Sequence, residues 1–473
     1  MILFRSMIFH ILFAVLLLLQ GCRSSNEKEP SRIYALYFPQ FHHDPINDAI
    51  WGRGFTDWTN LRRAPRFNRN NQSLLHPISR EVEPHLGYYD LTQAITRKRQ
   101  RELAEKYGVD GFIIHHYWFY QNESTENPPV LSRPLLRLLE DGEPNLPFAL
   151  NWALDNWVNA WQGRGHAYHP PNFHSSSERH IRRRHLVANR RGHNIHHSNT
   201  TSATALSAGS SNILYEQMCA VASDSDVQQH YRYLRQFFHH PNYIKVGGLP
   251  LFSVLRYVSN RCSNVIDRLL QLAQRDGFPA PGLHLTGGST AMASHDLYNS
   301  AISSSTLQKS VIPPSFLPEY AAHLYYPYFT FPKRLASMPS YCARGLLPSN
   351  HTSPQYLSVM TYFDHTPRRN AHTAVIWDRL FAAPLLPAAS FLIDLVTVMM
   401  YEQCCQASEV RAKGGKFVVI NAWNEWAEGM VLEPSTRFAY SFLEAVYQSK
   451  TAIRDISCNW QKYDDFLRKM ISY

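Results

Sequence analysis

Eight short apolar segments, separated by longer stretches with helical periodicity, are the feature that most limits how this chain can fold. Short apolar runs are typical of strands buried on both faces, and strands that alternate with helices form parallel sheets. The segments are Ile33–Phe38, Gly111–Trp118, Phe148–Trp152, Leu249–Leu255, Gly282–Thr286, His323–Phe329, Tyr356–Tyr362 and Phe417–Ala422. Eight such units are the number that closes a (β/α)8 TIM-type barrel. We therefore predict an α/β protein with one barrel domain over residues 32–450, followed by a C-terminal tail over 451–473.

The stretches between these segments carry the periodicity of helices. We expect helices over Leu91–Tyr107, Val227–Phe238, Asn264–Arg275 and Phe438–Ser449. The segment Phe381–Met400 is apolar enough to resemble a membrane span. It contains two prolines and an aspartate, so we predict a buried helix of the barrel instead.

Residues 164–212 interrupt the pattern. They are rich in His, Arg, Ser and Asn and show almost no apolar periodicity, which predicts a disordered basic insertion loop. The loop also holds much of the positive charge that gives the chain a net charge of +10. The rest of the sequence shows no zinc-finger spacing, RNP motif or basic helix, so we expect no nucleic-acid partner. The histidines of the loop have no fixed ligand spacing, so we predict no metal site there.

The first 31 residues form a hydrophobic leader and a polar linker. The apolar core Met7–Leu19 has the length of a signal-peptide core and is short for a membrane span, although its flanks to Cys22 leave a signal anchor open. A bacterial lipoprotein site at Cys22 is a further alternative. We expect the rest of the chain to cross a membrane, either as a secreted protein or as a single-pass protein facing the ER or Golgi lumen. Membrane contact would then be limited to an uncleaved leader.

Two further features fit this location. Asn-X-Ser/Thr acceptors occur at Asn71, Asn122, Asn199 and Asn350. The seven cysteines are too few for a disulfide scaffold and show no CxxC spacing. One or two bridges are expected among Cys219, Cys262, Cys342, Cys404, Cys405 and Cys458.

The stretch KFVVINAWNEWAEGMVLEP, residues 416–434, is the most informative for chemistry. A buried strand leads directly into polar and aromatic residues, at the end of a barrel strand where active sites lie. Glu425 and Glu428 are three residues apart, so in a turn they face the same way with Cβ atoms about 5–6 Å apart. Retaining glycosidases hold two carboxyl groups at roughly 5–5.5 Å, and such proximity raises one of the two pKa values. A helix start whose glutamates favour the dipole is the alternative explanation.

Several motifs together resemble the WbsX-type, glycoside hydrolase family 99-like proteins. They cover roughly residues 32–450 outside the insertion: ALYFPQFH (35–42), WGRGFTDWTN (51–60), LGYYDL (86–91), GVDGFIIHHYWF (108–119), NWALDNW (151–157), NYIKVGGLPLF (242–252), TPRR (366–369) and INAWNEWAEG (420–429). The resemblance implies a (β/α)8 barrel that acts on glycans. WbsX relatives are described as polysaccharide-building glycosyltransferases, and family 99 members as retaining, endo-acting mannosidases.

By motif, Glu425 would be the base that acts on the sugar 2-OH to give a 1,2-anhydro intermediate. Glu428 would protonate the leaving oxygen and then activate the incoming water. The sequence departs from the pattern at Asp155, where we expect Glu in WbsX relatives. No cofactor is implied.

The other candidate residues are polar and aromatic side chains, nearly all of them within these motifs and several at or just after strand ends. Each could contact sugar or serve the fold, by packing in the core or, for Asp57, by capping a helix. They are Tyr37, Gln40, His42, Asp57, Trp58, His116, Trp118, Asn151, Trp152, Asp155, Asn156, Asp364, Asn421, Trp423 and Trp426. His115 and His116 alternate across a strand, so only one can face the barrel axis, and we favour His116. Arg368 and Arg369 are interpreted as partners of acids on the rim.

These observations predict an enzyme that cleaves or transfers at glycosidic bonds of a glycan or polysaccharide. The sequence shows no DxD motif with a Rossmann-like nucleotide fold, which favours glycosidase-like chemistry. Two alternatives remain: a non-catalytic glycan-binding protein with the same fold, and a basic binder driven by the insertion.

Overall fold

The computed structural model describes the chain in eleven stretches. They are residues 31–79, 85–120, 129–154, 156–158, 213–255, 262–288, 322–325, 355–368, 376–377, 387–404 and 417–471. Residues 1–30 of the leader and linker and the whole insertion 164–212 therefore lie outside the described residues. So do Asp155, Arg369, Cys342, Cys405 and the glycosylation acceptors Asn122, Asn199 and Asn350. Within the described stretches, no helix has both the length and the hydropathy to cross a bilayer.

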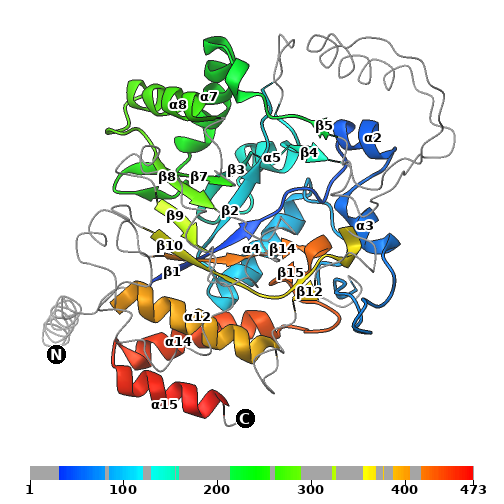
Figure 1. Cartoon of the computed structure of the whole chain (residues 1–473), viewed down its shortest axis with the longest axis vertical. Coiled ribbons are helices and arrows are strands. Elements are labelled where there is room, and N and C mark those ends of the chain that lie inside the picture. The colour runs from blue at the N-terminus through cyan, green and yellow to red at the C-terminus, as the bar shows by residue number, and fades with distance from the viewer. Residues whose placement is uncertain are drawn as a thin grey trace, which may run out of the picture.

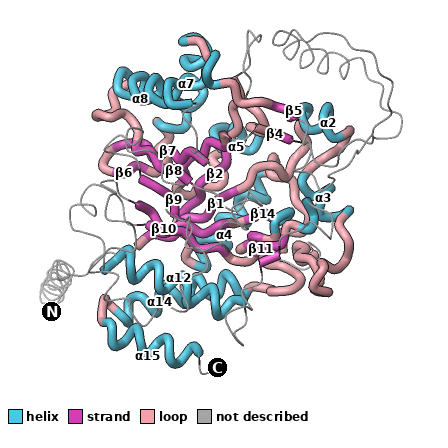
Figure 2. The backbone as a smooth tube through the Cα atoms, in the orientation of Figure 1, coloured by secondary structure: helices cyan, strands magenta, loops and turns pink. Residues whose placement is uncertain are grey.

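The fold is a mixed α/β arrangement around a mostly parallel sheet, with the strands at the centre and helices around them (Figure 2). Each of the eight predicted strands is present. They are β1 (Arg32–Tyr37), β2 (Gly111–His116), β3 (Phe148–Ala153), β7 (Leu249–Leu255), β8 (His284–Gly288), β9 (Ala322–Tyr325), β10 (Gln355–Met360) and β13 (Phe417–Asn421). Most begin or end within two residues of the prediction.

Every one of these eight strands pairs in parallel with two neighbours. The order runs β3-β2-β1-β13-β10-β9-β8-β7, and β3 also pairs with β7. β13 lies between β1 and β10, with Ala35 opposite Ile420 and Met360 opposite Asn421. Since parallel strands end at the same edge, the segment after β13 meets the segments after β1 and β10 there.

Helices connect the strands. They are α2 (Pro45–Trp51), α3 (Asp57–Arg63), α4 (Ala94–Tyr107), α5 (Arg133–Asp141), α7 (Asp224–Phe238), α8 (Ser263–Arg275), α12 (Pro387–Cys404), α14 (Ser441–Ile456) and α15 (Trp460–Ile471). α12, α14 and α15 lie together on one side of the strands, and α7 and α8 lie on the opposite side (Figure 1). The apolar segment near 390 is thus a packed helix, as predicted. The last predicted helix begins three residues later and continues to Ile456, and α15 follows it.

Capping residues set several helix ends. The α7 helix begins with a capping box, in which the Ser223 hydroxyl accepts from the Asp226 amide and the Asp226 carboxylate accepts from the Ser223 amide. The α4 helix ends at Gly108, whose φ of 85° is left-handed and therefore suits glycine. These residues fix the start of α7 and the end of α4.

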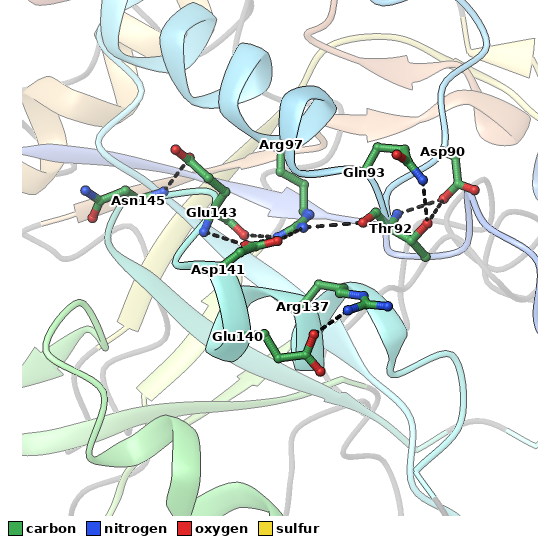
Figure 3. Close-up of polar contacts among 9 residues, drawn as sticks. All are labelled: Asp90, Thr92, Gln93, Arg97, Arg137, Glu140, Asp141, Glu143 and Asn145. Carbon is green, nitrogen blue, oxygen red and sulfur yellow. Dashed lines mark hydrogen bonds and ion pairs between the residues drawn. The ribbon is translucent and has the colours of Figure 1, made fainter.

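A buried arginine ties α4 to the end of α5 (Figure 3). Arg97 forms a bidentate pair with Asp141, with Nη1–Oδ1 and Nη2–Oδ2 distances of 2.9 and 2.6 Å. Its Nη1 also donates to the carbonyl of Glu143, and its Nη2 to that of Thr92. The guanidinium thereby fixes two neighbouring helices that cover the sheet.

Two disulfides are present among the described residues. Cys219 pairs with Cys262 at the start of α8, and Cys404 at the end of α12 pairs with Cys458 after α14. This number agrees with the prediction of one or two bridges. Both join segments on the periphery of the sheet.

Candidate active site

A tight hairpin after β13 carries the two predicted glutamates. β14 (Asn424–Glu425) pairs with β15 (Met430–Val431), and the 3-10 turn Trp426–Glu428 connects them. Gly429 closes the turn with a φ of 70°, a conformation that residues with a Cβ adopt at a cost. The Asn424 side chain attaches the hairpin to the end of β1, because its Oδ1 accepts from the Phe38 amide and its Nδ2 donates to the Phe38 carbonyl.

One buried guanidinium brings three carboxylates together. Arg368 lies in a 3-10 turn (Thr366–Arg368) after β11 (Phe363–Asp364) and is 5% exposed. Its Nη1 is 3.1 Å from Oε1 of Glu428, and its Nη2 is 3.8 Å from Oε1 of Glu425. The same Nη2 is 3.6 Å from Oδ2 of Asp57, the first residue of α3. Both glutamates therefore face a common point, as the spacing predicted.

The charges in this cluster strongly influence one another. Burial raises the pKa of Glu425 well above its usual value, the charge of Glu428 adds to the rise, and Arg368 opposes it. Burial also raises the pKa of Asp57, against the effects of Arg368 and of a hydrogen bond from Asn60. Burial alone would lower the pKa of Arg368, but the three carboxylates together raise it, so the guanidinium stays charged.

Buried polar atoms without hydrogen-bond partners line the strands beside this cluster. His115, Asn151 and Ser253 are register partners on β2, β3 and β7, so their side chains lie side by side on one face. The Nδ1 of His115, both amide atoms of Asn151 and the Oγ of Ser253 have no partner. Burial lowers the pKa of His115 to about 4, and the charge of Arg368 contributes to this. A polar ligand or water would satisfy such atoms.

The structure reverses the choice between the two histidines of β2. The ring of His116 packs against α7, with its Nε2 2.8 Å from Nε2 of His230 and its plane stacked on Tyr233. His115 is the one that faces the cluster, and its ring contacts Phe38, over which Arg368 also lies. The alternation across the strand was predicted correctly, but the sequence alone did not show which face α7 covers.

The five candidate tryptophans, four at or just after strand ends and Trp58 in α3, are packed inside the fold. Trp118 stacks on His230 of α7 with ring centroids 4.5 Å apart, and the Trp152 indole donates to the Trp118 carbonyl. Trp58 donates to the carbonyl of Tyr89. Trp423 and Trp426 both donate to Glu433. Among the described residues of this set none offers an open ring face, since each is at most 3% exposed.

Several other candidates bond within the protein. Tyr37 donates to Gln100 of α4, and His42 contacts the carbonyl of Pro39 through Nδ1. Asn156 accepts from the amide of Gln217. These side chains support the segments around the site, and none of these hydrogen bonds among the described residues joins them to the cluster.

Besides Asp57 and Asn151, three further predicted residues lie at or near the cluster. Gln40 donates to the hydroxyl of Tyr117, which interacts electrostatically with Glu425. Asn421 ends β13, and its Oδ1 is buried without a hydrogen-bond partner. Asp364 holds the turn that carries Arg368: one of its oxygens accepts from the amide and hydroxyl of Thr366, and the other accepts from Asn68.

Two important residues were missed or underrated in the sequence. Arg368 was interpreted as a rim residue, yet it is buried at the centre of the carboxylates. Glu433 was not singled out, although it follows the two glutamates in the same motif. Its presence in a continuous apolar stretch, MVLEP, was the available signal, because a buried carboxylate needs partners. In the described part of the chain, no three His, Cys, Asp or Glu side chains gather to hold a metal ion.

Comparison with known proteins gives one family and several similar chains. The family model described as "Glycosyltransferase WbsX" matches residues 33–187 and 194–446. Two proteins from strains of Xanthomonas campestris pv. campestris, both named "Uncharacterized protein WxcX", are 26% identical over 444 and 465 residues. The match covers 91% of this chain and 51% of theirs, so the chain spans about half the length of these relatives.

Solved structures with a similar arrangement include an endo-alpha-mannosidase of family GH99 from Bacteroides thetaiotaomicron. Two of its structures match with TM-scores of 0.45 and 0.41, at 12% and 13% sequence identity. They cover 90% and 93% of this chain and 98% and 99% of the matched chains. A chain described as "Glycoside hydrolase-like protein" matches with a TM-score of 0.41 at 12% identity, over 89% of this chain and 94% of its own length.

Proposed function

The chain belongs to the WbsX glycosyltransferase family, and from this premise we propose that it is an enzyme that cleaves or transfers at glycosidic bonds, with Glu425 and Glu428 as its catalytic pair. The observation that carries the proposal is the meeting of both carboxylates at one buried guanidinium. A glycan or polysaccharide is the proposed substrate. The partner-free polar atoms of His115, Asn151 and Ser253 support this, because sugar hydroxyls both donate and accept hydrogen bonds.

The proposal includes a (β/α)8 barrel. Eight parallel strands with parallel neighbours on both sides, and helices between them, support this architecture. In such a barrel the segments after the strands form the active-site face. The hairpin after β13, the turn that follows β10 and β11, and the start of α3 all contribute to the cluster, which is consistent with that face.

The chemistry needs one carboxyl group to give a proton and one carboxylate to accept one. In the proposed retaining route, a base removes the proton of the sugar 2-OH, and that oxygen bonds to the anomeric carbon. The leaving oxygen departs with a proton from the acid. Water or an acceptor hydroxyl then opens the three-membered ring, returns a proton to the former acid, and the former base reprotonates the 2-oxygen. Water gives hydrolysis and a sugar hydroxyl gives transfer.

The roles of the two glutamates can be distributed in two ways. The family resemblance implies Glu425 as the base and Glu428 as the acid. Burial and the charge of Glu428 instead favour a proton on Glu425, which suits the reverse distribution. Arg368 also lies closer to Glu428, at 3.1 Å with a hydrogen bond, than to Glu425, at 3.8 Å. Both distributions use the same pair.

The test begins with turnover. The chain is incubated with a panel of glycans, with and without nucleotide sugars, in water enriched in oxygen-18, and products are analysed by mass. Label in the new reducing end indicates hydrolysis, and its absence from a product longer than the substrate indicates transfer. We expect Glu425→Gln and Glu428→Gln each to reduce turnover by about 10²–10⁴-fold, the usual contribution of general acid–base groups. Glu444→Gln, an exposed carboxylate on α14, is the matched control.

A second substrate separates the two roles. A glycosyl fluoride needs little protonation of its leaving group, so the variant that lacks the acid should regain much of its activity and the variant that lacks the base should not. Glycan affinity should persist in Glu428→Gln. Full activity in both variants would remove the assignment of the pair, and binding by the wild-type protein without turnover of any glycan would favour a non-catalytic glycan-binding protein.

We also propose that the protein works in an oxidising compartment such as the ER or Golgi lumen or outside the cell. The two disulfides support this, since such bonds persist mainly in oxidising surroundings. Asn71 is exposed in a turn and is accessible as a glycan acceptor. A mobility shift on enzymatic deglycosylation of the protein made in eukaryotic cells, lost in Asn71→Gln, would test this site.

A further inference from the structure

Glu433 is a buried carboxylate whose four acceptor positions are all occupied. Its Oε1 accepts from the Trp423 indole at 2.9 Å and from Nε2 of Gln100 at 2.7 Å. Its Oε2 accepts from the Trp426 indole at 2.8 Å and from the hydroxyl of Tyr89 at 2.7 Å. The residue is 2% exposed, so these bonds are made out of contact with water.

Two donors lie on either side of the first arm of the hairpin, and the other two come from the elements behind it. Trp423 immediately precedes the strand that contains Glu425, and Trp426 lies between Glu425 and Glu428. Gln100 belongs to α4, and Tyr89 lies in the segment before that helix. The amide of Glu433 also donates to the carbonyl of Trp423. One side chain thus holds the two tryptophans of the hairpin against the outer side of the strands.

We propose that Glu433 is a positioning residue, whose carboxylate holds the hairpin of Glu425 and Glu428 in the geometry that the reaction needs. This inference rests on the proposed function of that pair. Among the described residues, the side-chain hydrogen bonds of Glu433 go to Trp423, Trp426, Gln100 and Tyr89 and not to the cluster around Arg368, so Glu433 acts through Trp423 and Trp426.

A carboxylate is required because an amide cannot satisfy the same partners. The indole N–H groups of Trp423 and Trp426 can only donate, and they bond to different oxygens of Glu433. Glutamine would place an NH2 group opposite one of them. The Tyr89 hydroxyl could turn to accept from that NH2 group, but an indole cannot. One arm of the hairpin would then lose its anchor inside the protein, where an unmatched donor is costly.

The protonation state of Glu433 also changes near neutral pH. Burial raises the pKa of Glu433 to about 7, against the four hydrogen bonds that stabilise the ionised form. The titratable groups that face Glu433 are Tyr89, which donates to it, and Tyr37, which donates to Gln100. Burial raises the pKa values of both tyrosines well above their usual value of 10, and the charge of Arg97 on α4 partly opposes this rise for Tyr37. Protonation of Glu433 turns one acceptor oxygen into an O–H group, so the donors at that oxygen meet a weaker acceptor and a competing proton.

The test compares Glu433→Gln with the wild-type chain on the substrate that the glycan panel identifies. We expect kcat to fall by about 10²-fold at pH 8.5, the size of effect that a displacement of about 1 Å produces, with KM changed by less than about threefold. The ratio of wild-type to variant kcat should rise with pH through about 7 and then level off, because below this pH the wild-type side chain is neutral as well.

Hydrogen exchange gives a readout that does not need activity. Amides of 422–433 should exchange about tenfold faster in Glu433→Gln and remain unchanged in Tyr463→Phe, the matched control. Tyr463 lies in α15, away from the hairpin, and its replacement by Phe removes a buried hydroxyl that bonds to Thr397 of α12. Should Glu433→Gln fail to fold, Tyr89→Phe removes a single donor from Glu433 and should show the same change in kcat and exchange, only smaller.

The outcomes separate this inference from the proposed function. A pH-independent kcat ratio, or equal losses in Glu433→Gln and Tyr463→Phe, would reduce Glu433 to a general stabilising residue and overturn the inference. Unchanged exchange at 422–433 in both Glu433→Gln and Tyr89→Phe would overturn it as well. If the wild-type chain turns over no glycan while exchange responds as expected, the proposed function fails but the anchoring of the hairpin by Glu433 stands.

Discussion

Replacing Arg368 with methionine is the sharpest perturbation of the cluster. The guanidinium is buried, and its nitrogens lie 3.1 Å from Glu428, 3.6 Å from Asp57 and 3.8 Å from Glu425. Methionine keeps most of the side-chain volume and removes the charge. Three acidic groups then share a buried space with no cation beside them among the described residues.

The size of the effect follows from these distances. A pair of unit charges about 4 Å apart interacts with roughly 4 kcal/mol at the effective dielectric constant of about 20 that suits protein sites. Burial of the guanidinium offsets much of the attraction, and removing one partner of a buried pair typically costs about 3–5 kcal/mol. We expect the free energy of unfolding of Arg368→Met to be lower by about that amount at pH 8.

The loss of unfolding free energy in Arg368→Met should depend on pH, and the direction follows from the pKa shifts. Arg368 holds down the pKa values of Asp57 and Glu425, which burial already raises, so its removal raises both further. An acid whose folded-state pKa lies above its unfolded value favours folding below the unfolded pKa, and this contribution is lost as pH rises through the folded pKa. The stability difference between Arg368→Met and wild type should therefore shrink as pH falls from 8 towards 5.

Urea unfolding at several pH values between 5 and 8, followed by tryptophan fluorescence, measures this difference. Arg437→Met is the control, because Arg437 lies over the rings of Tyr362 and Phe438 and bonds to the Tyr362 hydroxyl. A loss in Arg368→Met that is the same at pH 5 and pH 8, or no larger than that of Arg437→Met, would refute the assignment of Arg368 as the counter-charge of the carboxylates.

Three further predictions concern the scaffold. Burial lowers the folded-state pKa of His116 to about 3, so below about pH 6.5 the unfolded chain binds a proton that the folded chain does not, and the free energy of unfolding should fall on acidification by about 1.4 kcal/mol per pH unit. In His116→Asn, the urea midpoint should lose this part of its pH dependence. Gly429→Ala should cost about 1–3 kcal/mol in thermal unfolding and lower turnover, since its φ is positive and the new Cβ would lie 3.0 Å from the Asp364 amide nitrogen; unchanged stability would contradict the conformation of this turn. Replacing Cys404 and Cys458 by serine should cost about 2–4 kcal/mol in urea unfolding, because that bridge closes a loop with a sequence separation of 54; a fully stable variant would show that this bridge does not hold α12 to the C-terminal helices.

The secondary structure was largely readable from the sequence. Runs such as Phe417–Ile420 are continuous and apolar because the strand is buried on both faces, and the structure places all four residues inside. The helix periodicity was also reliable, since amphipathic faces repeat locally along the chain. Boundaries shifted by a few residues where a cap rather than the pattern ends the element, as at Ser223, which starts α7 before the predicted Val227.

The candidate site was only partly readable. Glu425 and Glu428 could be found because their spacing and the strand before them lie within one short stretch. Asp57 was also a candidate and Arg368 was expected to pair with acids, but the sequence could not show that both meet this pair, because their segments are distant in the sequence and come together only through the packing of strand ends. For the tryptophans the sequence left sugar stacking and core packing equally open, and their burial became visible only once α7 and Glu433 were in place.

The sequence by itself determined the order of strands and helices, the family, and the hairpin on which two acidic groups stand three residues apart. Such features depend on local patterns, in which each residue is compared with neighbours a few positions away. Tertiary structure alone decided that Arg368 is buried among three carboxylates, that His115 and not His116 faces them, and that Glu433 holds the hairpin from behind. These outcomes depend on which faces of the elements pack together, and the balance of burial and charge at those contacts is fixed only when the whole chain has folded.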